Sequence, residues 1–140
     1  MRLVLDTNTV VSGLLWKNAS SKLIDAGLEG RVELITSSAL LLELEDVLPR
    51  RKFARQVAAS GFSVAQLVAR YAVLARSTTP AVISPVSVDP DDDHVLACAL
   101  AAQADLVVSH DADLLNLKAY HGMSIVTAAD ALERIARLAR

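Results

Sequence analysis

Short apolar runs alternate with longer segments of helical spacing along most of this chain. Four of the runs, each bounded by polar or turn residues, have the length and composition of buried β-strands. They cover Arg2–Leu5, Val32–Ile35, Leu106–Val108 and Ser124–Val126, and a weaker run covers Ala81–Ile83. The chain is therefore expected to build a sheet from short strands.

The segments between these runs predict helices, because apolar residues recur there at helical spacing with polar caps and glycine or proline stops. The predicted helices cover Ser20–Leu28, Ser37–Leu48, Phe53–Ala59, Val64–Ala75, Asp92–Gln103 and Ala128–Leu138. Strands that alternate with helices predict a mostly parallel sheet with helices on both faces. Residues 37–75 contain no predicted strand, so we expect them to form a helical arm over one edge of the functional site.

Composition and net charge limit the number of domains and the kinds of surface that the chain can form. The 140 residues, 53% of them hydrophobic, suit a single domain over residues 1–140. The net charge of −2 excludes a broad basic surface, so contact with nucleic acid must come from local patches. The single cysteine, Cys98, is predicted to be buried in a helix. Because neither a signal-peptide pattern nor an apolar stretch of ~18 residues is found, we expect a cytoplasmic protein without membrane contact.

Acidic residues recur close to the predicted ends of successive strands. Asp6 directly follows the first strand, Glu43 follows the second after a capped helix start, Asp93 opens a helical run, and Asp111 follows Leu106–Val108. In an open α/β sheet, ligands bind beyond the carboxyl ends of the strands, where strand order reverses. Carboxylates delivered there from distant parts of the chain would converge and repel one another unless protons or a cation compensate them.

A divalent metal ion is the natural partner for such a cluster. Mg²⁺ or Mn²⁺ takes oxygen ligands and keeps several of its waters. One or two such ions can polarise a phosphate and generate hydroxide for in-line attack. The sequence therefore predicts a metal-dependent phosphodiester-cleaving site built from Asp6, Glu43, Asp93 and Asp111.

Each of these acids also has an ordinary structural explanation. Asp and Asn cap helices, and acids in a first helical turn interact favourably with the helix dipole. We assign that role to Asp89 and Asp91 in the run Asp89–Asp93. Asp92 competes with Asp93 for the place in the site, and spacing alone does not decide between them.

Polar residues beside the strand ends are candidates for supporting roles. Asn8 and Ser12 are candidates to orient the first carboxylate or a metal-bound water. Ser109 is a candidate to hold a carboxylate or the scissile phosphate through its hydroxyl. His110 is expected to be a surface residue rather than a general base.

The ordered set of these elements resembles the PIN-domain ribonucleases. The matching segments are Val4–Asn8, Leu42–Leu44, Asp91–Ala97 and Leu106–Leu115, followed by Ile125–Val126 and a final helix. The resemblance runs from residue 2 to about residue 132. The ordered set is specific, whereas the Asp-Thr-Asn start alone is a weak signal.

The resemblance implies a three-layer α/β/α fold, single-stranded RNA as substrate, Mg²⁺ or Mn²⁺ as cofactor and often a homodimer. In the family's Thr/Ser-x-Asp element this chain has Ser109, a mild departure that keeps the hydroxyl. Many small bacterial members that resemble this chain are VapC-like toxins, which a cognate antitoxin holds inactive. The resemblance places the family's acidic quartet on Asp6, Glu43, Asp93 and Asp111, with Asp113 as an accessory acid.

One cluster of basic residues interrupts the nearly neutral chain just after the helix of Glu43. It consists of Arg50, Arg51, Lys52 and Arg55. The functional interpretation is contact with the phosphate backbone, which positions RNA without reading its sequence, and the other interpretation is a solvated helix face. Trp16 is expected to be partly buried, with stacking on a base as the alternative.

Three other functions compete with a ribonuclease. A haloacid-dehalogenase-like phosphatase has a nucleophile loop similar to Asp6–Thr9, but it needs a second aspartate where this chain has Asn8. A phosphoacceptor receiver needs a late lysine, and Lys118 lies several residues beyond Asp113. A PIN fold that binds RNA or a partner without cleaving is the third alternative, and the complete acidic set argues against it.

Overall fold

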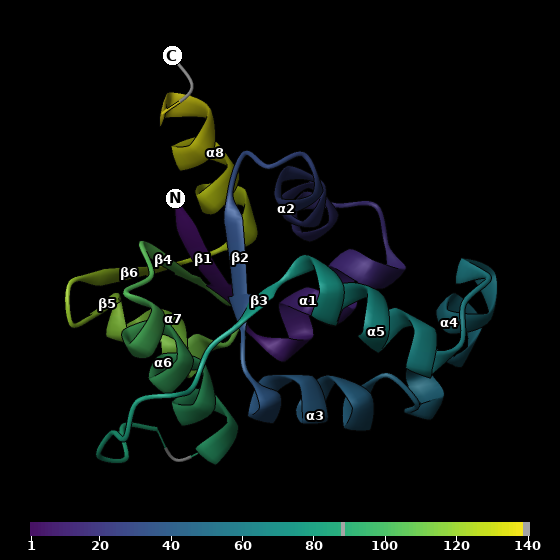
Figure 1. The fold of residues 1–140 in the computed structure, drawn as a ribbon, viewed down its shortest axis with the longest axis horizontal. Helices are drawn as coiled ribbons and strands as arrows, with labels where there is room; N and C mark the ends of the chain where they lie inside the picture. Colours follow the sequence, from purple (N-terminus) through teal and green to yellow (C-terminus); the bar gives the residue numbers. More distant parts are fainter. Residues whose placement is uncertain (88, 139–140) are drawn as a thin grey trace.

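The computed structural model describes residues 1–87 and 89–138, which form a six-stranded sheet between layers of helices (Figure 1). The strands are β1 (Arg2–Leu5), β2 (Glu33–Thr36), β3 (Arg76–Ser77), β4 (Leu106–Val108), β5 (Ala119–Tyr120) and β6 (Met123–Val126). They lie in the order β3-β2-β1-β4-β6-β5, and all neighbours are parallel except β5 and β6. The predicted, mostly parallel sheet is confirmed.

Every predicted helix is present, with ends within two residues of the prediction. The sequence pattern does not indicate α1, which is rich in threonine and valine, residues of modest helix propensity, or α7, which has only six residues. The helices are α1 (Thr7–Leu15), α2 (Ala19–Leu28), α3 (Ser38–Val47), α4 (Ala54–Ser60), α5 (Val64–Leu74), α6 (Pro90–Ala102), α7 (Ala112–Leu117) and α8 (Ala128–Leu138), with a short 3₁₀ helix, η1 (Arg51–Phe53), before α4.

Alternate strand residues face opposite sides of the sheet, and this alternation defines the three layers. Leu3 and Leu5 of β1 join a core with side chains of α1, α2, α5 and α8, whereas Val4 joins a second core with α6 and α7. Cys98 is buried in the second core, as predicted. Figure 1 shows α2 and α8 on one side of the sheet and α6 and α7 on the other. The three-layer α/β/α arrangement is confirmed.

The weak strand predicted at Ala81–Ile83 is absent, so this prediction is wrong. Residues 78–86 have no regular secondary structure, and the Val82 side chain is fully exposed. Pro80 and Pro85 flank the run, and proline lacks the amide that a sheet ladder requires. The outer strands β3 and β5 instead have only two residues each, too few to leave an apolar pattern in the sequence.

Residues 38–74 form the predicted helical arm, which consists of α3, η1, α4 and α5. Ser37 caps α3 through the Leu40 amide, and Gly61 ends α4 with a φ of 77°. Helix α3 packs against α1 and α6, so the arm lies beside the carboxyl end of the sheet.

No single helix in residues 1–87 and 89–138 is long and apolar enough to cross a membrane. Residues 51–60 and 64–74, which are bent by 73° relative to each other, are long and apolar enough only when they are taken together as a pair.

Candidate metal centre

The candidate site lies where strand order reverses, between β1 and β4. Their register pairs Leu5 with Val108, so the residues that follow, Asp6 and Ser109, are neighbours at the carboxyl end of the sheet. The Asp6 amide donates to the Val108 carbonyl oxygen at 3.0 Å. Asp6 is only 7% exposed, and Ser109 is fully buried. The sheet itself therefore fixes the first carboxylate.

The two carboxylate oxygens of Asp6 have different hydrogen-bond donors. Oδ1 accepts from the Thr9 amide at 2.9 Å and so caps α1, while Oδ2 accepts from the Ser109 hydroxyl. The Ser109 oxygen in turn accepts from the Asp111 amide at 3.0 Å. Ser109 thus holds the carboxylate of Asp6 and ties it to the strand end that carries Asp111. Capping and a place in the site are compatible roles for Asp6.

Asp111 and Asp113 approach the same place from the start of α7. Asp111 caps this helix, and its Oδ1 accepts from the Asp113 amide at 2.7 Å. One carboxylate oxygen each from Asp92, Asp111 and Asp113 lies within 4.8 Å of the other two. Three carboxylates at this separation repel one another strongly, and a divalent cation would offset that repulsion.

The start of α6 brings Asp92, and not Asp93, into the site. Asp92 is 7% exposed, and its Oδ2 accepts from the Ser87 hydroxyl at 3.0 Å. The Oδ1 of Asp93 instead accepts from the amides of Val86 and Ser87 at 3.1 and 3.0 Å, so Asp93 holds the preceding loop. Successive residues of a helix point about 100° apart. The placement of Asp93 in the shared site is therefore corrected to Asp92, its competitor in the sequence.

Glu43 reaches the site from the middle of α3 rather than from a strand end. Its side chain is half-buried, and Oε2 is buried without a hydrogen-bond partner among the described residues. Burial raises the pKa of the Glu43 carboxyl, the nearby Thr7 hydroxyl opposes part of this shift, and the carboxylates of Asp91 and Asp6 add to it. A buried acceptor without a partner is costly, so this oxygen is available to a ligand.

These side chains line one pocket of about 50 Å³, and six of its nine lining residues are acidic. Burial raises the pKa of Asp92 to about 6, against the opposing Ser87 hydrogen bond, and the carboxylates of Asp111, Asp89 and Asp6 add to the rise. Asp113 lies outside this lining but close to Asp92 and Asp111. The lining residues are Asp6, Thr7, Asn8, Glu43, Asp89, Asp91, Asp92, Val95 and Asp111.

Sequence reasoning missed that Asp89 and Asp91 line the pocket as well. Asp89 caps α6 as predicted, and its Oδ1 accepts from the Asp91 amide at 3.0 Å. The sequence feature that could have indicated this is their place in the same acidic run as Asp92. The supporting role of Ser87, which donates to Asp92, has no signal in the sequence because residues 78–87, which carry it, form no helix or strand.

The remaining candidates divide between the pocket and the surface. Asn8 is exposed and lines the pocket, whereas the Ser12 hydroxyl accepts from Asn18 Nδ2 at 2.8 Å and does not orient Asp6. His110 is exposed, as predicted. The basic residues lie beyond α3, around η1, with all four side chains exposed and none lining the pocket: Arg50, Arg51, Lys52 and Arg55.

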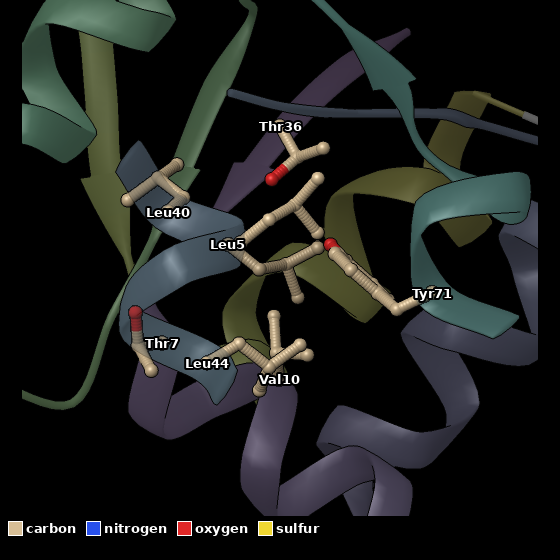
Figure 2. Close-up of a pocket in the computed structure, with 8 residues that line it drawn as sticks. Leu5, Thr7, Val10, Thr36, Leu40, Leu44 and Tyr71 are labelled. Carbon is tan, nitrogen blue, oxygen red and sulfur yellow. The ribbon is translucent and has the colours of Figure 1, made fainter. Parts of the chain in front are cut away.

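A second, much smaller cavity of about 10 Å³ lies next to this candidate metal pocket, and Thr7 lines both. Figure 2 shows its mostly aliphatic walls, with the Tyr71 ring reaching from α5 toward Leu5 and Thr36. The hydroxyls of Tyr71 and Thr7 are buried without partners among the described residues. This space is about the size of one water molecule, so it is too small to hold a substrate.

A comparison of the sequence with models of protein families shows to which family the chain belongs. The family model described as PIN domain matches residues 2–113, four-fifths of the chain. The chain belongs to the PIN-domain family. The match contains the carboxylates of the candidate metal centre and ends before the last strand and helix. These carboxylates belong to Asp6, Glu43, Asp92, Asp111 and Asp113. No protein of curated function matches the sequence.

Membership of the family bears on the functions that compete with a ribonuclease. PIN domains are generally metal-dependent nucleases, so membership together with the carboxylate cluster supports nuclease chemistry at this pocket. It argues against the haloacid-dehalogenase-like phosphatase and the receiver module, which are different families. A PIN domain that binds without cleaving stays as the alternative that an assay must test.

Proposed function

We propose that this PIN domain is a metal-dependent ribonuclease that cleaves single-stranded RNA at the carboxylate pocket. The observation that carries the proposal is the convergence of Asp92, Asp111 and Asp113 within 4.8 Å, beside Asp6 and Glu43. These groups come from the end of β1, from α3, from α6 and from the start of α7, so the fold, not local sequence, brings them together. Carboxylates this close together repel one another unless protons or a cation compensate them.

The donor set fits Mg²⁺ or Mn²⁺, because it consists of carboxylates, the oxygen ligands that both ions prefer. Asp6, Asp92, Asp111 and Asp113 would hold the ion, and the unpartnered Oε2 of Glu43 offers a further acceptor. A bound ion of this kind polarises a phosphate oxygen and lowers the pKa of a bound water.

The chain's own residues prepare the site for this chemistry. Ser109 fixes the orientation of Asp6, and Ser87 fixes that of Asp92, so both carboxylates are oriented by hydrogen bonds of the fold. Glu43, with its raised pKa and free oxygen, is suited to accept a proton from the attacking water. The pocket is small and lies between α1, α3 and α6. We therefore expect a flexible single strand to reach it more readily than a duplex.

Purified protein should cleave an unstructured RNA oligonucleotide when Mg²⁺ or Mn²⁺ is added. EDTA should abolish cleavage, because the carboxylates alone repel the phosphate backbone. A gel assay with single-stranded RNA, single-stranded DNA and duplex RNA of one sequence measures the preference. Cleavage that persists in EDTA would contradict the mechanism, and metal-dependent cleavage of DNA alone would contradict the substrate.

We also propose that the protein is the toxin of a toxin–antitoxin pair in the cytoplasm, with an antitoxin as partner and a homodimer as its assembly. Support comes from the resemblance of its sequence motifs to those of small bacterial toxins of the family and from the acidic pocket of a nearly neutral chain. A guanidinium pairs bidentately with carboxylates. We expect an antitoxin segment to place an Arg or Lys in the pocket, with apolar side chains packed on the arm of residues 38–74.

Expression of the chain alone should arrest bacterial growth, and co-expression with the product of the neighbouring gene should restore it. Arrest follows from RNA cleavage, so the Asp92→Asn variant should not arrest growth even at equal protein level. Co-purification and a cleavage assay of the complex measure the inhibition. Unchanged growth together with metal-dependent cleavage in vitro would reject the toxin role and leave the nuclease.

A further inference from the structure

The tryptophan of this chain, Trp16, is exposed at the end of α1. It is the single tryptophan in the sequence, and 41% of its surface is accessible. The ring packs edge-on against Phe53 of η1, with ring centroids 6.1 Å apart and planes at 72°. Trp16 is therefore partly buried, as expected, and the rest of its surface is open to solvent. Two of the five aromatic residues of the chain meet at this one place on the surface.

Basic residues lie next to this aromatic pair. The Lys52 ammonium lies over the Phe53 ring, 5.1 Å from its centroid, and the exposed Lys17 directly follows Trp16. None of the neighbouring basic residues forms a salt bridge within residues 1–87 and 89–138, so their charge is available to a ligand. These residues are Lys17, Arg50, Arg51, Lys52 and Arg55.

Helix α1 connects the aromatic pair to the metal pocket. Asp6 caps the start of the helix in the pocket, and Trp16 caps its end, with the Trp16 amide donating to the Ser12 carbonyl at 3.0 Å. Asn8, Ser12 and Trp16 are four residues apart, so they follow one another along one side of the helix. The helix has nine residues, which corresponds to about 13 Å. A single strand bound at the pocket needs only a few nucleotides to reach Trp16.

The position of Trp16 is fixed by close packing of α1 on α2. A Cβ at Gly13 would lie 2.6 Å from Ile24 Cδ1 and 2.9 Å from the Ser20 backbone, so only glycine allows this approach. The Asn18 side chain donates to Ser12 and caps α2 within the same turn. Trp16 also lines an open depression of about 850 Å³ next to α2 and α8. The backbone that carries Trp16 is therefore fixed by packing, and its side chain borders a space that can take a ligand.

We propose that Trp16 and Phe53, flanked by Lys17 and Lys52, form a base-stacking platform that holds single-stranded RNA one helix length from the cleavage pocket. This inference rests on the proposed ribonuclease function. An exposed tryptophan that packs on a half-buried phenylalanine, with cations free of salt bridges beside it, matches a polyanion that carries aromatic bases. The neutral side of α1, with Asn8 and Ser12, provides the path between the two sites. Helix α3 does not, because Glu45 and Asp46 on it are exposed acids.

Binding to an intact oligouridylate and to an abasic oligomer of equal length tests the platform directly, because the two probes carry the same charge. The measurements use the Asp6→Asn variant with Mg²⁺, so that the probe stays uncut. We expect quenching of the Trp16 fluorescence by the oligouridylate and much weaker quenching by the abasic probe. Trp16→Leu should weaken binding of the oligouridylate by roughly 5- to 150-fold, the range for one stacked base, and bring the two probes to similar affinity.

Phe62→Leu is the matched control, since Phe62 is 36% exposed and also carries a cation, Arg70, 4.4 Å from its ring centroid. It should leave affinity and cleavage unchanged. Lys52→Gln should weaken both probes alike and reduce the slope of log affinity against log salt by roughly one. Unfolding curves of each variant show whether it is folded.

The outcomes separate the platform from the ribonuclease. If the wild-type chain cleaves RNA but Trp16→Leu behaves like Phe62→Leu, the platform is rejected and the ribonuclease stands. If the wild-type chain neither binds nor cleaves RNA, both proposals fail. Self-association that Trp16→Leu abolishes, with RNA affinity unchanged, would assign the patch to a protein contact and overturn the platform.

Discussion

The substitution Asp92→Asn is expected to lower the rate of RNA cleavage by at least about 100-fold, since loss of an indirect support of a metal ligand already costs 10- to 100-fold. Asp92 is buried, faces Asp111 and Asp113, and receives a hydrogen bond from Ser87. An asparagine there keeps the shape of the side chain but removes the negative charge that the ion needs. Initial rates over a range of Mg²⁺ concentration measure the loss, and we expect added metal to recover part of it.

The adjacent substitution Asp93→Asn is the matched control. An asparagine Oδ1 can still accept from the amides of Val86 and Ser87, so the loop should keep its conformation and most activity should remain. Equal losses in the two variants would contradict the assignment of Asp92 as the ligand. A larger loss in Asp93→Asn would restore the assignment that the sequence alone favoured.

The contrast between these two residues shows how far sequence reasoning reaches. Hydrophobic runs predict the parallel strands and most helices, because burial between two layers demands them. Asp6 and Asp111 follow from that frame, since each lies just past a buried strand. Asp92 and Asp93 are neighbours in the first turn of α6, and their side chains point in different directions around the helix axis. Which of them faces the pocket depends on how the start of the helix is placed. Pro90 starts it two residues earlier than the pattern predicts.

Other parts of the site depend on contacts that no local pattern records. Glu43 lies on α3 among leucines, and only the packing of α3 against α1 and α6 turns it toward the pocket. Ser87 supports Asp92 from residues 78–87, which form no helix or strand. Pairing of Trp16 with Phe53 joins residues 37 positions apart and follows from the fold of the arm. Such positions are set by tertiary structure, so they could not be predicted from the sequence.

The free energy of unfolding of the metal-free protein is expected to fall as the pH rises from about 5 to about 7.5. The pKa of Asp92 is about 6 in the folded protein, above the ordinary value of 3.8. Between these values the folded state binds more protons than the unfolded state, so stability decreases with rising pH. A difference of about two pKa units corresponds to at most about 3 kcal/mol, and between these two pH values we expect a loss of about 1–2 kcal/mol. The raised pKa of Glu43 contributes with the same sign.

Urea unfolding with EDTA and with Mg²⁺ across this pH range measures the effect. Mg²⁺ binds the ionised carboxylates, so its stabilisation should grow with pH and offset or reverse the decline. Asp92→Asn should raise the metal-free stability near pH 7.5 and flatten its pH dependence, because the variant has no carboxylate to ionise there. Asp93→Asn should keep the decline. A metal-free protein that becomes more stable over this range would show that the pocket carboxylates do not oppose folding, and the main physical reason for a metal ion in this pocket would then be lost.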